Sequence, residues 1–213
     1  MKTDDLIDLL AREAGPAETD LGTRRFALAL GGGGACSALL MAATLGVNPA
    51  LAQYVWLPTF WNKVVFVAAL VSISLIAVRR LSRPGAGLGQ LPIALALPIL
   101  AVWAVAILVL LRAAPGQRAD AFFGLTWTVC PFLVALLSGP VFIGVIWAMK
   151  GLAPTRLRLA GAAAGFLSGA VGALVYCLHC PELAPPFIGF WYLLGILIPT
   201  AIGALLGNRL LRW

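Results

Sequence analysis

Six uninterrupted apolar segments constrain this chain more than any other feature of its sequence. Each is about 20 residues long, which is the length that a helix needs to cross a hydrocarbon core about 30 Å thick. The segments must be helical, because an open strand would leave backbone groups without hydrogen-bond partners in lipid. They are continuous rather than alternating, which excludes a β-barrel. The predicted spans are residues 26–47, 60–78, 91–111, 131–149, 159–178 and 187–206.

The composition supports the same fold class. Hydrophobic residues make up 62% of the chain and charged residues only 11%, whereas a soluble domain has about 25% charged residues. This excludes a soluble enzyme, a nucleic-acid binder with a basic surface and a disordered regulator. We therefore predict an all-α, polytopic bundle of six transmembrane helices over residues 26–213, preceded by a cytoplasmic tail, residues 1–25.

The positions of the basic residues predict the orientation of the bundle. Twelve of the fifteen lysines and arginines fall before the first span, in the second and fourth connections or at the C-terminus. Basic residues gather on the cytoplasmic side of membrane proteins, so we expect both termini to be cytoplasmic. The three others are Lys63, Arg112 and Arg118, and we expect Lys63 to extend from the outer end of its span to water.

The spans carry no charged residue near their centres, and two of them carry regularly spaced glycines. The missing charges argue against a transporter of charged substrates, although a small transporter remains an alternative. Gly161, Gly165 and Gly169 are four residues apart, as are Gly203 and Gly207. Such faces allow close helix packing, either within one chain or between copies in a homo-oligomer.

Three of the four cysteines are predicted to meet at the outer end of the bundle. Cys36 lies inside the first span, where we expect a small buried side chain. Cys130 precedes the fourth span, Cys177 ends the fifth, and Cys180 follows in the last outer connection with His179 beside it. On the outer side of a membrane, these groups would face an oxidising environment.

Three interpretations of these cysteines are open. A disulfide from Cys130 to Cys180 or Cys177 would simply connect two loops. Alternatively, the same thiols form a sensor, in which a helix N-terminus favours the Cys130 thiolate and His179 helps the cysteines to bind a soft metal ion transiently. As a third possibility, Cys177 and Cys180 form the redox pair of a membrane thiol oxidoreductase. No other cofactor is expected.

The first 20 residues form a separate acidic segment, with six acidic and two basic residues. Thr3 is a suitable N-cap, and leucines at helical spacing predict a short amphipathic helix. An acidic helix is a poor match for an anionic bilayer but suits a groove with a basic rim on a cytoplasmic partner. A simply solvated tail is the third possibility. The predicted partner-binding residues are Asp4, Asp5, Leu6, Asp8, Leu9 and Leu10.

Several short motifs, in order along nearly the whole chain, resemble the NrsF-type negative regulators of sigma F. They are MKTDDLI at residues 1–7, FWNK at 60–63, TWTVCP at 126–131, GLAPTR at 151–156 and LHCPE at 178–182. The resemblance implies an inner-membrane anti-sigma factor of Gram-negative bacteria, without enzymatic activity or direct nucleic-acid binding. Such a protein holds an extracytoplasmic-function sigma factor inactive and releases it under heavy-metal or oxidative stress. Cys130 and Cys180 lie in matching motifs and are implied to be sensory.

Overall fold

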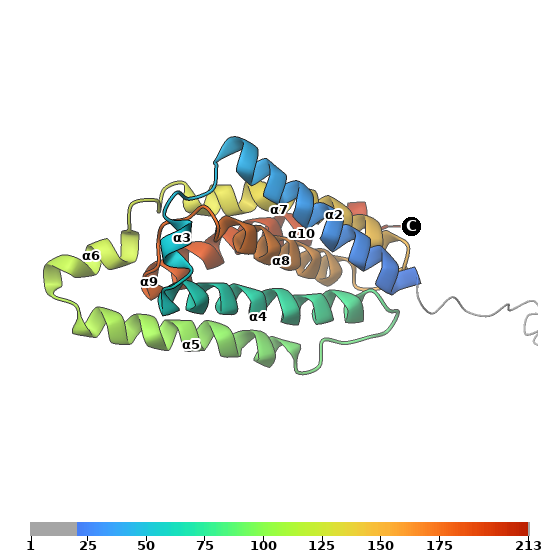
Figure 1. The fold of residues 1–213 in the computed structure, drawn as a ribbon. Helices are drawn as coiled ribbons and strands as arrows, with labels where there is room; N and C mark the ends of the chain where they lie inside the picture. Colours follow the sequence, from blue (N-terminus) through green and yellow to red (C-terminus); the bar gives the residue numbers. More distant parts are fainter. Residues whose placement is uncertain (1–20, 213) are drawn as a thin grey trace, which may run out of the picture.

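The computed structural model describes residues 21–212 and confirms the predicted fold class (Figure 1). Six helices in these residues are long and apolar enough to cross a membrane, and this part of the chain contains no strand. The long helices are α2 (Leu21–Thr44), α4 (Pro58–Leu81), α5 (Leu91–Arg112), α7 (Cys130–Lys150), α8 (Leu157–Tyr176) and α10 (Leu193–Leu210). The last span also includes α9 (Pro185–Phe187) and a π-helical turn, η1 (Ile188–Tyr192).

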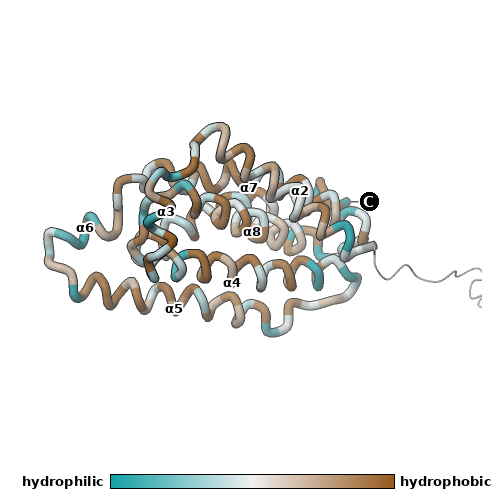
Figure 2. Tube along the Cα trace, in the orientation of Figure 1, coloured by the Kyte–Doolittle hydropathy of each residue, from teal (hydrophilic) through white to brown (hydrophobic). Residues whose placement is uncertain are grey.

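The helix limits lie close to the predicted ones, and the largest shift is at the beginning. α2 starts at Leu21, before the predicted start of the first span at residue 26. Two short helices, α3 (Leu51–Tyr54) and α6 (Pro115–Phe123), lie in the connections that follow α2 and α5. Figure 2 shows hydrophobic residues along the long helices and more hydrophilic ones toward their ends and connections, as a membrane-spanning bundle requires.

Helix α8 lies at the centre of the bundle and packs against α10, α7, α4 and α2 (Figure 1). Helix α5 is peripheral and contacts mainly α4 and α9. Only 6% of its most apolar stretch is buried inside the protein, compared with 61% for α8. The side chains of α5 are therefore available to lipid, whereas those of α8 form the core.

The glycine faces pack against each other within one chain. Gly161 on α8 lies against Gly203 on α10, and a Cβ atom added to either glycine would collide with the carbonyl oxygen of the other. Gly165 has the same relation to the backbone of Pro199. Both faces are thus used inside the monomer, where missing side chains let two backbones approach closely.

The bundle has two chemically different ends. Helix α2 begins, and α10 finishes, at the same end (Figure 1), which we call the termini end. The opposite end carries α3, α6, α9 and the segments around Cys130, Cys177 and Cys180. We call it the thiol end.

Candidate functional site

The three predicted cysteines come together in the core at the thiol end. Cys130, Cys177 and Cys180 belong to one cluster of buried residues that also contains Tyr176 and Tyr192. None of these cysteines forms a disulfide. We call the side chains of Cys130, Cys177 and Cys180 the thiol cluster.

Local backbone geometry brings two of the thiols to the cluster from one turn. The chain continues past α8 as a tight turn, in which the N–H of Cys180 donates to the carbonyl of Tyr176 over 2.9 Å. The other thiol comes from the first residue of α7, where the N–H of Cys130 donates to Thr126 O over 2.9 Å. Pro131 follows at the second helical position, where a missing N–H costs nothing.

The thiols are much less accessible than predicted. Cys130 is at the helix start, as expected, but its exposed fraction is 0%, and that of Cys180 is 1%. A helix N-terminus activates a thiol that solvent can reach. A reagent in solution can therefore reach these thiols only if one of the surrounding segments moves.

The same burial bears on the oxidoreductase alternative. Burial raises the pKa of the Cys177 thiol to about 11, against the opposing effect of nearby Lys63. A redox pair that exchanges disulfides needs an accessible thiolate of low pKa. Cys177 does not have this property, and its environment does not favour that alternative.

Cys36 differs from the sequence prediction, and two tyrosines lie in the core beside the thiols. Cys36 is exposed on the outer surface of α2 rather than buried, because Ser37 instead turns inward and donates to the carbonyl of Leu137. The side chains of Tyr176 and Tyr192 are completely buried. Trp56 and Trp61 at the same end are exposed, as is common for tryptophans at a membrane–water interface.

His179 lies near the thiols but is occupied by another contact. Its Nδ1 atom is 2.9 Å from the carbonyl oxygen of Gly46, in the first connection. Between residues 21 and 212, no group of three or more histidine, cysteine, aspartate or glutamate side chains is arranged to hold a metal ion. A soft ion at this place would thus require the surrounding turn to rearrange.

Lys63 is the important site residue that the sequence prediction missed. The expectation that it extends to water is wrong, because its exposed fraction is 1%. Its Nζ donates to the carbonyl oxygens of Cys180, over 3.0 Å, and Glu182, over 3.1 Å. We call this pair of hydrogen bonds the Lys63 bridge. A lysine within an apolar segment was the available signal, but its partners lie far away in the sequence.

Glu182 connects the two segments that carry the thiols. Its carboxylate accepts a 2.7 Å hydrogen bond from the N–H of Leu125, in the connection that leads to Cys130. The neighbouring Gly124 has a φ of 57°, and a Cβ atom there would lie 2.7 Å from the same carboxylate. Glycine satisfies both the backbone conformation and the close approach. The segments before Cys130 and after Cys180 are therefore joined directly.

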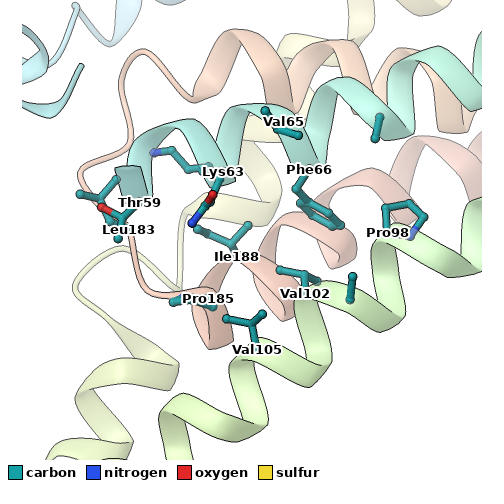
Figure 3. Close-up of a pocket in the computed structure, with 13 residues that line it drawn as sticks. Thr59, Lys63, Val65, Phe66, Pro98, Val102, Val105, Leu183, Pro185 and Ile188 are labelled. Atoms are coloured by element: carbon teal, nitrogen blue, oxygen red, sulfur yellow. The ribbon is translucent and has the colours of Figure 1, made fainter. Parts of the chain in front are cut away.

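A cavity of about 340 Å³ lies beside this site, between α4 and α5 (Figure 3). Lys63 and Phe66 of α4 line one wall, Pro98 and Val102 of α5 line another, and Ile188 contributes from η1. Its walls are mostly apolar. Packing of α4 against α5 is consequently incomplete near the Lys63 bridge.

Comparison with known proteins identifies the group to which this chain belongs. Residues 10–213 match the family model described as negative regulator of sigma F, NrsF. The chain belongs to the NrsF family. It is 58% identical over 213 residues to the probable anti-sigma-F factor of Azospira oryzae, and 39% identical over 215 residues to the anti-sigma-F factor of Caulobacter vibrioides. Both matches cover all of this chain and all of the relative. No solved structure gives a significant match.

The segment predicted to bind a partner of this NrsF-family chain lies outside the described residues. This applies to Asp4, Asp5, Leu6, Asp8, Leu9 and Leu10. The described chain begins with α2, where Thr23 accepts a 3.0 Å hydrogen bond from Arg79 Nη2 of α4. Arg25 lies over the ring of Trp147, with 5.7 Å between its guanidinium carbon and the ring centroid. The base of the acidic segment is therefore held by contacts with α4 and α7.

Proposed function

We propose that this chain is an anti-sigma-F factor of the bacterial inner membrane. Its acidic N-terminal segment binds sigma F and holds it inactive. Sigma F is here an extracytoplasmic-function sigma factor. The observation that carries the proposal is the full-length similarity to the probable anti-sigma-F factor of Azospira oryzae, at 58% identity. Six apolar helices supply the membrane anchor. The described chain has no separate soluble domain, which leaves the N-terminal segment and the basic connections to bind the sigma factor.

The acidic segment suits this role by its charge and its pattern. Its six acidic residues complement a basic rim on the partner, and its leucine face fits an apolar groove. Such a contact would cover the surface that the sigma factor needs for RNA polymerase. Release then requires a change at the thiol end to lower the affinity, by about 1.4 kcal/mol for each tenfold change.

Cys130 and Cys180 are the proposed sensory residues. With a peroxide as the oxidant, the two thiols would form a disulfide, losing two protons and two electrons, while the peroxide is reduced to water. With a soft divalent ion, two protons would be displaced and the ion would bridge the two thiolates. Support comes from the shared buried cluster and from Glu182, which joins the segments that carry these thiols. In either case the start of α7 would become linked to the turn that follows α8.

The first experiment compares the intact protein with a form that lacks residues 2–20. Both are purified in detergent from cells that express the sigma F of the same organism. We expect sigma F to co-purify with the intact protein and to be lost, by at least tenfold, from the truncated form. Retention by neither form would contradict the anti-sigma function. Equal retention by both forms would instead place the contact on the membrane domain.

A further inference from the structure

The Lys63 bridge connects helix α4 to the turn that carries Cys180. The two acceptor carbonyls belong to Cys180 and Glu182, on either side of Pro181. Lys63 is the sixth residue of α4, and its Nζ also lies 5.6 Å from the ring centroid of Phe60. A shift of the Cys180 turn therefore acts directly on the first turns of α4.

Burial makes this connection obligatory rather than incidental. A buried polar group that loses its hydrogen-bond partners is strongly unfavourable, more so if it is charged. If the Cys180 turn moves, Lys63 must either follow its two carbonyl partners or lose them inside the core. The exposed arginines at this end, Arg112 and Arg118, face no such constraint. The position of α4 thus depends on the position of the Cys180 turn.

Helix α4 extends from this bridge to the base of the N-terminal segment. It is continuous over 24 residues, which corresponds to about 36 Å at 1.5 Å per residue. At its termini end, Arg79 donates to Thr23 at the start of α2, three residues after the segment that ends at residue 20. Figure 1 shows α4 running between the two ends of the bundle.

The surroundings of α4 leave it space to move at the thiol end. On one side α4 packs against the central helix α8. On another, the cavity of about 340 Å³ separates it in part from α5 (Figure 3). Phe66 of α4 and Val102 of α5 both line this cavity. Displacement of α4 toward α5 is therefore less restricted than displacement toward α8.

We propose that Lys63 is a positioning residue that carries the state of the thiol cluster through α4 to the N-terminal segment. This inference rests on the proposed function. Lys63 does not react with oxidant or metal, and it acts by holding the Cys180 turn against α4. Loss of the bridge has the same effect as the signal. The Cys180 turn is released, α4 shifts, and the affinity for sigma F falls.

The test measures two properties of Lys63→Met in membranes of a Cys36→Ser, Cys177→Ser background. One is the rate at which maleimide labels Cys130 and Cys180, and the other is the amount of sigma F that co-purifies without oxidant or metal. For Lys63→Met we expect labelling at least tenfold faster and retention at least tenfold lower. Lys63→Arg, which keeps N–H donors, should lie between Lys63→Met and the parent. Arg118→Met removes an exposed cation at the same end and should match the parent in both.

The two readouts separate the possible failures. Parental labelling and retention in Lys63→Met would overturn the inference, and so would faster labelling with unchanged retention. If the parent itself retains no sigma F, the proposed function fails and this inference with it, while the labelling rate still shows whether Lys63 holds the turn. If Lys63→Met does not accumulate in membranes, Lys63→Gln is measured in the same way with the same criteria.

A variant at the other end of α4 tests the path itself. Arg79→Gln removes the contact with Thr23 but leaves the Lys63 bridge intact. We expect labelling at the parental rate, together with at least a threefold smaller loss of sigma F when the membranes are treated with cadmium or peroxide. Normal release by Arg79→Gln would show that α4 does not carry the change to the N-terminal segment.

Discussion

At the scale of single residues, the three buried thiols make different predictions although they share one cluster. Serine replaces the sulfur of cysteine with a smaller oxygen and keeps the rest of the side chain, so the fold should be kept while the redox and soft-metal chemistry is lost. We expect Cys130→Ser and Cys180→Ser to reduce induction of a sigma F-dependent reporter by cadmium or peroxide at least tenfold. Cys177→Ser is the matched control, because Cys177 is equally buried, and it should respond like the parent.

The control also tests the alternative chemistry. A response lost equally in Cys177→Ser and Cys180→Ser would favour a Cys177–Cys180 redox pair. Normal responses in all three variants would make the thiols structural only. Membrane levels of each variant are measured by immunoblot, so that a loss of protein is not mistaken for a loss of sensing.

Sequence patterns predicted the meeting of these thiols but not their burial. The predicted limits of the spans are sufficient to place three cysteines at the same end of the bundle, namely Cys130, Cys177 and Cys180. Whether a side chain in a loop is buried or exposed depends on segments that are distant in the sequence. Lys63 illustrates the limit: its carbonyl partners on Cys180 and Glu182 are 117 and 119 positions away. A periodic pattern reports only on neighbours in the sequence, so a lysine near a helix end was assigned to water.

At the scale of elements, the close approach of α8 and α10 predicts a sharp effect of one methyl group. A Cβ atom at Gly165 would lie 2.7 Å from the Cα of Thr200 and closer still to the backbone of Pro199. Because these are backbone atoms, the helices must separate to accept it. We expect Gly165→Ala to destabilise the detergent-solubilised protein by about 1–3 kcal/mol, visible as a lower midpoint of thermal unfolding.

Gly32 on α2 provides the matched control for this substitution. Apart from its own stretch of helix, nothing lies within 4 Å of a Cβ placed there, so Gly32→Ala should be neutral or stabilising by up to about 1 kcal/mol through helix propensity. Equal effects of the two substitutions would show that helix packing is not responsible. The regular spacing of glycines predicted a packing face on each helix. It did not show which faces pair, because spacing says nothing about the partner helix.

At the scale of the whole molecule, the uneven distribution of charge predicts how the bundle lies in the membrane. Apart from Lys63, Arg112 and Arg118, the chain has twelve basic residues. Each of them either precedes α2 in the sequence or belongs to a segment at the termini end. Positive charge is retained on the cytoplasmic side during insertion. We therefore expect the termini end to face the cytoplasm, where sigma F and the polymerase are, and the thiol end to face the oxidising side.

Reporter fusions measure this orientation directly. A fluorescent protein fused after the C-terminus should be fluorescent, and alkaline phosphatase fused at the same position should be inactive. Fusions after Ala50, at the thiol end, should give the opposite result. Active phosphatase at the C-terminus would reverse the orientation and place the thiol cluster in the reducing cytoplasm. A disulfide signal from outside the cell would then be excluded. The expected orientation instead requires the signal to cross the bilayer through protein. Helix α4 contacts both the Cys180 turn and the base of the N-terminal segment.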